Sequence, residues 1–346
     1  MPFARARAAL DDATLGLLLL CLGAGSIVAM PLAGALAARI GCRAVIIAAA
    51  LPLCLTLPLL ASLSGPTSLA VALLGFGAGL GAIDVTMNIQ AVIVERASGR
   101  PMMSGFHGLY SVGGIAGAAC MTALLGMGAQ PWVATLCIVA CLIVALIAAG
   151  PRLLPFGGRD DGPMFALPRG IVLFIGVLCF ISFLAEGAVL DWSAVFLNSV
   201  GGMATAYAGL GFASFSLAMT ICRLLGDAVT RRFGGTNVLI FGGFCAAAGF
   251  ACLALVPFWP AALAGFALIG VGCSNIVPVL FTAAGRQSAV PEHMAISAIS
   301  TLGYAGALAG PAAIGFVAHA SSLRVAFVAL AIMQLALAAS GRLLKV

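Results

Sequence analysis

The stretch GAGLGAIDVTMNIQAVIVE, residues 77–95, is apolar except for a few small or polar residues that recur along one side. Gly77, Gly81, Asp84, Asn88 and Glu95 follow one another at spacings of four, three, four and seven. These spacings place them on one stripe of an α-helix. The segment is therefore predicted to span a membrane, with an acid and an amide one helical turn apart. A carboxylate at bilayer depth costs about 2.5–3.5 kcal/mol on insertion scales, so we expect Asp84 to have a partner, a proton or water nearby.

A second helix is predicted after a short turn at residues 97–101, and its polar positions also share one stripe. They are Ser104, His107, Ser111 and Gly114. Asp84 therefore has two interpretations: it takes up and releases a proton, or it hydrogen-bonds Asn88 or His107 and joins the two helices. We favour the first, because ionisable residues inside membranes usually mark transport and proton pathways.

The composition sets the class of protein. The 346 residues are 63% hydrophobic and only 8% charged, whereas a soluble domain has about 25% charged residues. So few charges cannot cover the surface of a soluble fold, so we predict an all-α, polytopic membrane protein. The apolar runs are continuous rather than alternating, which excludes a transmembrane β-barrel.

Glycine, proline and charged residues separate eleven apolar runs that are long enough to cross a bilayer. The predicted helices cover residues 13–37, 43–62, 67–95, 102–127, 131–150, 169–197, 205–230, 236–256, 258–285, 292–319 and 323–342.

Arginines predict the orientation of these helices. They lie in alternate connections, at residues 39–43, 96–100, 152–159, 231–232 and 286, and Arg324 is the exception on the other side. The positive-inside rule makes these connections cytoplasmic. Three tryptophans, Trp132, Trp192 and Trp259, fall at span ends on the opposite side, as interfacial aromatic residues do. We therefore expect a bacterial cytoplasmic (inner) membrane protein with a cytoplasmic C-terminus.

An internal repeat predicts two similar halves. The stretch GALAARIGCR, residues 34–43, recurs loosely as DAVTRRFG, residues 227–234, and GLGAID at 79–84 recurs as GVGCSN at 270–275. Nearly equal offsets imply parallel repeats. We predict an N-terminal half, 1–150, with five helices, a linker, 151–168, and a C-terminal half, 169–346, with six.

The first half is then one helix short. Its N-terminal arm, residues 1–12, would be outside the cell although it carries Arg5 and Arg7. We expect that a helix is missing upstream, and the alternative is a true eleven-helix protein.

These features resemble the major facilitator superfamily, in which two six-helix halves share a G-x-L-a-D-R-x-G-x-R loop. Ala38 stands where the superfamily has an acid, and the residues that match the loop are Gly34, Leu36, Ala37, Arg39, Gly41 and Arg43. The stretch 79–88 resembles the fourth helix of fucose-permease-like proton symporters, where an acid stands four residues before an asparagine. The stretch EGAVLDWS, residues 186–193, resembles the seventh helix of YbjJ-type inner-membrane proteins.

The resemblance implies alternating access around a central cavity. It assigns helices 67–95, 169–197 and 258–285 to the cavity wall, and each carries a polar group: Asp84 with Asn88, Glu186, and Asn275. Asp84 matches the proton-coupling acid of the symporters. Glu186 is a candidate second proton or substrate group, and Asn88 and Asn275 are candidate substrate ligands.

Further polar residues have both functional and structural interpretations. Asp191 is either an outer-gate or substrate group or an interfacial residue. His107 and Tyr304 are candidate substrate ligands, and helix packing is the alternative for both.

A second group lies at the predicted inner surface. Arg223 and Asp227 are four residues apart, which favours an ion pair that could latch the halves together. Glu95, at the same level, is a candidate for the same role in the first half. Arg39 and Arg43 of the matching loop are the other gating candidates.

Several classes of function lack support in the sequence. The eleven cysteines are scattered without a C-x-x-C pair, and no phosphate-binding loop, catalytic triad or metal motif is present. We therefore expect no cofactor, no metal, no nucleic-acid partner and no enzymatic activity.

The sequence predicts a monomeric, proton-coupled secondary transporter of a small polar, sugar-like solute, with Asp84 as proton carrier and Glu186 assisting. One alternative is proton-driven efflux of amphipathic compounds. Another is a non-transporting sensor or an inactive, truncated transporter, if the first helix is absent.

Overall fold

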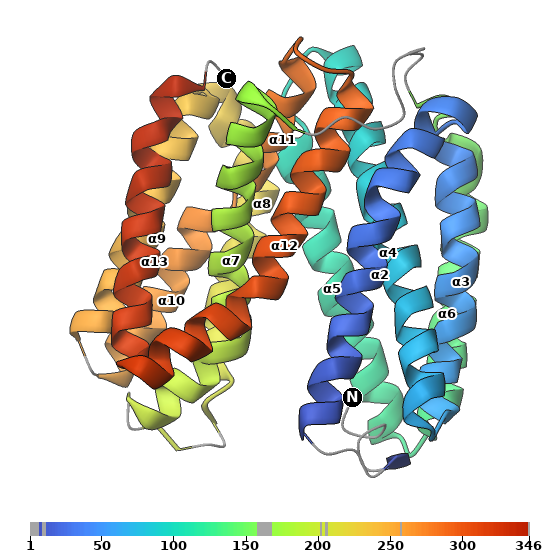
Figure 1. Ribbon diagram of the computed structural model, residues 1–346, viewed down its shortest axis with the longest axis horizontal. Helices are drawn as coiled ribbons and strands as arrows, with labels where there is room; N and C mark the ends of the chain where they lie inside the picture. The colour runs from blue at the N-terminus through green and yellow to red at the C-terminus, as the bar shows by residue number, and fades with distance from the viewer. Residues whose placement is uncertain are drawn as a thin grey trace. The chain divides into compact units, whose positions relative to one another are not determined.

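The computed structural model describes residues 7–8, 12–157, 168–200, 203–204, 207–256 and 258–344 (Figure 1). Within these ranges the regular structure is helical and no strand is present. Eleven helical spans there are long and apolar enough to cross a membrane, which confirms the predicted fold class. Arg5 of the N-terminal arm and residues 158–167 of the predicted linker lie outside the described residues.

The first five long helices follow the predicted spans closely. They are α2 (Asp12–Ile40), α3 (Cys42–Ser62), α4 (Pro66–Ser98), α5 (Met103–Gly126) and α6 (Pro131–Ala149), followed by the short η1 (Gly150–Arg152). The later helices are α7 (Gly170–Ser199), α8 (Leu210–Phe233), α9 (Gly235–Leu255), α10 (Trp259–Cys273), α11 (Ile276–Arg286), α12 (Glu292–Ala320) and α13 (Leu323–Ser340).

One prediction was wrong: the single helix expected at 258–285 is broken into α10 and α11. Asn275 lies between the two with φ −112° and ψ 0°, outside the helical region. Pro278 explains the break, because proline has no N–H to donate and its ring crowds the carbonyl four residues earlier. That carbonyl belongs to Ser274, which is left without its usual helical partner.

The chain forms two compact units. The first unit contains Met1–Ile93, Val112–Leu167 and Val290–Thr301, and the second contains Val94–Ser111, Pro168–Ala289 and Leu302–Val346. The start of α5 thus belongs to the second unit, and the start of α12 belongs to the first. The division into halves at 1–150 and 169–346 stays a prediction about the repeat.

Glycines on α4 bring it close to α2 in the first unit. A Cβ at Gly77 would overlap the Leu22 carbonyl, and one at Gly81 would lie 2.7 Å from the Ser26 carbonyl oxygen. The Ser26 hydroxyl donates to the Gly77 carbonyl at 2.8 Å. Small residues allow such close helix contacts in lipid, so the glycine part of the 77–95 stripe is a packing surface that fixes α4.

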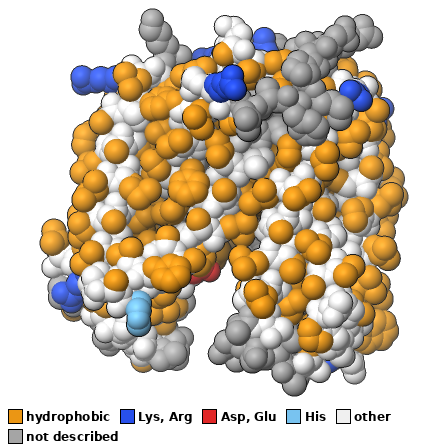
Figure 2. All heavy atoms as spheres, in the orientation of Figure 1, with side chains coloured by type: hydrophobic (Ala, Val, Ile, Leu, Met, Phe, Trp, Pro, Cys, Tyr) orange, Lys and Arg blue, Asp and Glu red, His pale blue; other side chains and the backbone are white. Residues whose placement is uncertain are grey.

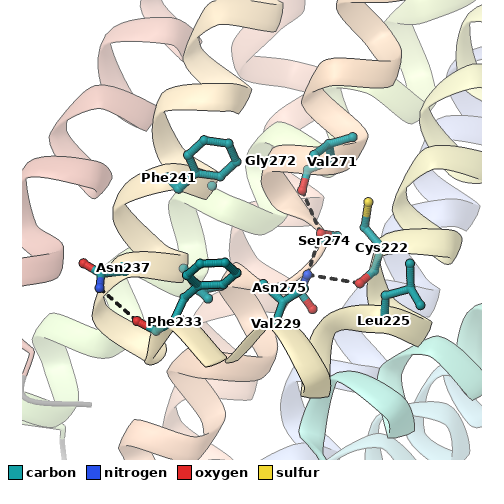
Figure 3. Close-up of a pocket in the computed structure, with 12 residues that line it drawn as sticks. Cys222, Leu225, Val229, Phe233, Asn237, Phe241, Val271, Gly272, Ser274 and Asn275 are labelled. Carbon is teal, nitrogen blue, oxygen red and sulfur yellow. Dashed lines mark hydrogen bonds between the residues drawn. The ribbon is translucent and has the colours of Figure 1, made fainter. Parts of the chain in front are cut away.

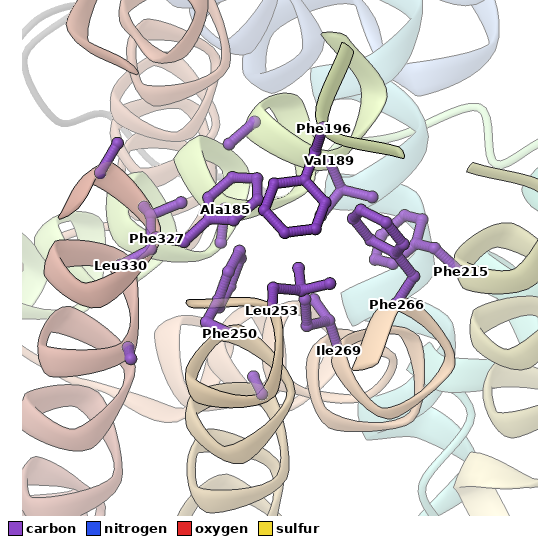
Figure 4. Close-up of a cluster of buried hydrophobic side chains, with 14 of the residues drawn as sticks. Ala185, Val189, Phe196, Phe215, Phe250, Leu253, Phe266, Ile269, Phe327 and Leu330 are labelled. Carbon is purple, nitrogen blue, oxygen red and sulfur yellow. The ribbon is translucent and has the colours of Figure 1, made fainter. Parts of the chain in front are cut away.

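The second unit has an aromatic core. Phe196 of α7, Phe250 of α9, Phe266 of α10 and Phe327 of α13 are all fully buried, and Figure 4 shows their rings around one centre. The ring centroids of Phe196 and Phe327 are 5.1 Å apart. The core joins helices that are far apart in sequence, such as α9 and α13, which run side by side in Figure 1.

The surface is that of a membrane protein. Figure 2 shows hydrophobic side chains over most of the visible face. Large apolar residues such as Leu51 on α3 and Ile147 on α6 are 66% and 70% exposed, which water would disfavour and a bilayer would not.

Candidate functional site

Asp84 lies on α4 in the first unit, and its side chain is partly exposed. Asn88 is buried, and its amide donates to the backbone carbonyl of Asp84 at 2.9 Å rather than to the carboxylate. Among the described residues, no hydrogen bond or ion pair engages the Asp84 carboxylate. The alternative in which this carboxylate bonds Asn88 or His107 therefore gains no support.

Two carboxylates hold the start of α5 in the second unit. Glu95 Oε2 accepts from the N–H groups of Met102 and Met103 at 2.8 and 2.9 Å. Asp227 Oδ1 and Oδ2 accept from the next two N–H groups, those of Ser104 and Gly105, both at 2.9 Å. The start of a helix leaves its first N–H groups without backbone partners, and here the two carboxylates accept from four consecutive ones. Both anions lie at the positive end of the helix dipole, which stabilises them.

Each carboxylate also ties the start of α5 to a helix from later in the chain. Asp227 belongs to α8, and Glu95 Oε1 accepts from the Thr282 hydroxyl of α11 at 2.7 Å. The sequence suggested that Asp227 pairs with Arg223, one turn away. The structure corrects this prediction. Asp227 caps the start of α5, and Arg223 pairs with Glu186.

We expect Asp227→Ala to lower the free energy of unfolding by about 2 kcal/mol, because two charge-assisted hydrogen bonds and a favourable helix-dipole interaction are lost. Thermal melting of the purified protein in detergent measures this. Asp191→Ala removes an exposed carboxyl from α7 and is the matched control, for which we expect no change. Equal melting temperatures for both variants would contradict the capping role.

Arg223 of α8 is the centre of a buried polar cluster in the second unit. Its Nη2 lies 3.4 Å from Glu186 Oε2 on α7, and its Nη1 donates to the Ser111 hydroxyl of α5 at 3.2 Å. Its Nε donates at 3.2 Å to the Ser274 carbonyl, the one that Pro278 leaves free. Groups from α5, α7 and the break between α10 and α11 therefore meet at the guanidinium of α8.

Two polar atoms of this cluster have no hydrogen-bond partner among the described residues. They are Glu186 Oε1 and His107 Nε2, and both are buried. His107 packs edge-on against Phe281, with the ring centroids 5.7 Å apart, and interacts electrostatically with Arg223. Unsatisfied buried polar atoms are uncommon and call for an explanation.

Asn275 takes part in the helix break. Its amide nitrogen donates to the Cys222 carbonyl at 3.2 Å and to the Ser274 hydroxyl at 2.9 Å. Its Oδ1 lies against Gly226, where a Cβ would overlap it. Asn275 therefore joins α8 to the break between α10 and α11.

Asn275 also lines a pocket of about 510 Å³ in the second unit. Figure 3 shows its amide bonded to Ser274 and Cys222, beside the rings of Phe233 and Phe241. The lining is otherwise mostly apolar and includes Val229.

The remaining candidates lie elsewhere. Asp191 and Arg39 are exposed. Tyr304 packs near Phe183, with ring centroids 6.2 Å apart. Arg43 binds the start of the linker, where its Nε donates to the Leu153 carbonyl at 2.9 Å. A gating role for either arginine stays a prediction.

Sequence reasoning missed Thr282 and Ser274. Thr282 gave no signal, because a hydroxyl within an apolar run usually bonds its own helix. Ser274 could have been found, since Pro278 follows it at the spacing that frees a helix carbonyl.

The sequence profile of the Major Facilitator Superfamily matches residues 2–288. The chain belongs to the major facilitator superfamily. An uncharacterised MFS-type transporter of Yersinia pestis is 55% identical over 343 residues, which cover 99% of this chain and 89% of the relative. The membrane protein MosC of Rhizobium meliloti is 32% identical over 315 residues, covering 90% of this chain and 77% of MosC.

Solved structures confirm the major facilitator fold. The E. coli fucose:proton symporter FucP matches with a TM-score of 0.82 at 15% identity, covering 100% of this chain and 94% of FucP. The proton:xylose symporter XylE matches with a TM-score of 0.75 at 14% identity, covering 98% of this chain and 88% of XylE. At such identities the likeness concerns the fold. This facilitator is therefore a multi-pass membrane transporter by family and architecture.

Proposed function

We propose that this facilitator is a proton-coupled secondary transporter that moves a small polar solute by alternating access, with Asp84 as the proton carrier. The observation that carries the proposal is a partly exposed carboxylate inside a membrane span, without a partner among the described side chains. Burial favours the neutral form of such a group and contact with water favours the charged form. A carboxyl that alternates between these surroundings takes up and releases a proton.

The fold neighbours support this choice, since two of them are a fucose:proton and a proton:xylose symporter. A bacterial cytoplasmic membrane, a cytoplasmic C-terminus and a monomeric state are part of the same proposal. Glu95 and Asp227, the two carboxylates that cap the start of α5, can act as a conformational switch. Asp227 and Glu95 bind this segment through hydrogen bonds that can break in one state and re-form in the other.

The test is solute-driven proton movement in proteoliposomes that contain the purified protein. We expect at least one member of a panel of small polar solutes, from L-fucose and D-xylose to D-gluconate, to make the weakly buffered medium more alkaline, because each solute molecule enters with a proton. A protonophore should abolish the signal, and protein-free liposomes should give none. A solute that enters without any pH change would exclude proton coupling.

Efflux of amphipathic compounds is the second candidate, and the pocket beside Asn275 favours it. Its mostly apolar lining and its few polar side chains, those of Asn237, Ser274 and Asn275, suit a compound with a large hydrophobic body and a small polar group. Phe233 and Phe241 are 55% and 67% exposed, so the pocket borders a surface that lipid would cover. An amphipathic compound could then enter it from the bilayer.

Val229→Trp should fill this pocket and weaken ethidium binding to the purified protein about tenfold if efflux is the function. Fluorescence anisotropy measures the affinity. Leu217→Trp is the matched control, because Leu217 is an exposed residue of α8 that does not line the pocket. Equal ethidium affinity in both variants would count against an amphipathic substrate in this pocket.

A further inference from the structure

The pair formed by Arg223 and Glu186 is buried but loosely made. Arg223 is 7% exposed, yet the nitrogen–oxygen distance to Glu186 is 3.4 Å, longer than the 2.7–2.9 Å or so of a good charge-assisted hydrogen bond. The second carboxylate oxygen, Oε1, has no partner in the described part of the chain. If the ion pair served only to stabilise the fold, both carboxylate oxygens would be expected to accept hydrogen bonds from the planar guanidinium group.

The arrangement leaves the guanidinium ready to exchange partners. Its other two contacts, with the Ser111 hydroxyl and the Ser274 carbonyl, are neutral, so they orient the arginine without cancelling its charge. In the described part of the chain, Glu186 is the residue that pairs with this charge. A carboxylate that replaced Glu186 would bind a guanidinium that is already oriented and positively charged. His107 Nε2, which has no hydrogen-bond partner among the described residues, is a further polar neighbour of Arg223.

Charge balance decides what Glu186 does in such an exchange. With Arg223 and Glu186 both charged, the cluster is neutral. A bound carboxylate would leave one uncompensated negative charge among buried groups, which is strongly unfavourable. Uptake of one proton by Glu186 restores neutrality and also removes its attraction to Arg223.

We propose that Arg223 is the binding residue for the carboxylate of a small organic acid, and that Glu186 releases Arg223 by taking up one proton as the acid binds. The proton comes from water and goes to a Glu186 oxygen, and no other bond changes. This inference rests on the proposed transport function and narrows its substrate class to small monocarboxylates. A dianion such as phosphate would leave a negative charge that the single proton does not compensate.

The other titratable groups near this pair are few. Cys273 of α10 and Cys179 of α7 itself interact electrostatically with Glu186, and His107 of α5 interacts with Arg223. Both cysteines are fully buried and stay neutral thiols. His107 adjoins the positive charge of Arg223, which disfavours a second positive charge there, so Glu186 is the group that exchanges the proton.

Isothermal titration calorimetry of the purified full chain tests the inference, with acetate and D-gluconate as acidic probes and D-sorbitol as the neutral match. Titrations in two buffers of different ionisation enthalpy give the number of protons taken up. We expect the wild type to bind the acids with uptake of one proton each. Glu186→Gln, which resembles the protonated state, should bind them about tenfold more tightly and without proton uptake.

Two further variants separate binding from folding. The double variant Glu186→Gln with Arg223→Gln keeps the cluster neutral, so it should remain folded but bind neither acid. Arg223→Lys keeps the charge and loses the planar fork, so it should bind the acids more weakly than the wild type does.

The outcomes distinguish this inference from the transport proposal. Failure of Glu186→Gln to bind either acid, or equal binding of D-sorbitol, would overturn the inference, even if proteoliposomes carry neutral sugars with protons. Proton-linked acid binding in the expected order, without flux in proteoliposomes, would uphold the subsite and refute transport.

Discussion

Asp84→Asn should abolish proton movement driven by the solute while leaving exchange of solute across the membrane intact. Asparagine has nearly the same shape as aspartate but carries no titratable proton, so the α4 site would stay permanently in its neutral form. Internal and external solute could still exchange, because the loaded carrier can reorient. Net, proton-driven accumulation should fall at least tenfold, to the level of protein-free liposomes.

The measurement combines a pH-sensitive dye with labelled solute in the same proteoliposomes. Asp191→Asn is the matched control, because it removes a carboxyl at an exposed position of α7, and it should retain proton flux. Equal proton flux in Asp84→Asn and the wild type would remove Asp84 from the role of carrier.

Gly226→Val should destabilise the protein by about 3 kcal/mol or more, the upper range for overpacking. A Cβ at Gly226 would overlap Asn275 Oδ1 and lie 2.6 Å from the Ser104 Cβ. Asn275 cannot easily move, since its amide is held by the Cys222 carbonyl and the Ser274 hydroxyl. We expect a lower yield of folded protein and a lower melting temperature in detergent.

Gly113→Val is the control for this change. A Cβ at Gly113 meets nothing within 4 Å, so the same substitution in another helix should change the stability only slightly, in the favourable direction, because valine is a somewhat better helix former than glycine. Similar melting temperatures for the two variants would show that the contact between α8 and Asn275 is not tight.

The helices could be predicted because a membrane span is a local property. Continuous apolar runs fix the positions of α2 to α9, and positions such as Gly41 and Gly234 mark turns with positive φ, 87° and 80°. The break at Asn275 was missed because most of the run at 258–285 is apolar, and its apolar length outweighed the single Pro278. The local distribution of apolar residues therefore predicts where each membrane span lies, but it does not predict a break inside a long apolar segment.

The site could be predicted only in part. Asp84 and Glu186 stand out because charge is rare in apolar helices. The partners of Arg223 could not be derived, since Glu186 is 37 residues away and Ser111 is 112 residues away. Such pairings depend on which helix faces meet, and helical periodicity places residues on a face without saying which face it contacts.

The membership of Val94–Ser111 in the second unit has a consequence for biosynthesis. The ribosome delivers this segment well before α8 and α11 exist, so its two carboxylate anchors remain incomplete until Asp227 and Thr282 emerge. Cutting the polypeptide at residues 158–167 would give a C-terminal fragment that holds most of the second unit but lacks its segment Val94–Ser111. Two separately expressed pieces should regain the native arrangement only when both are made in the same membrane.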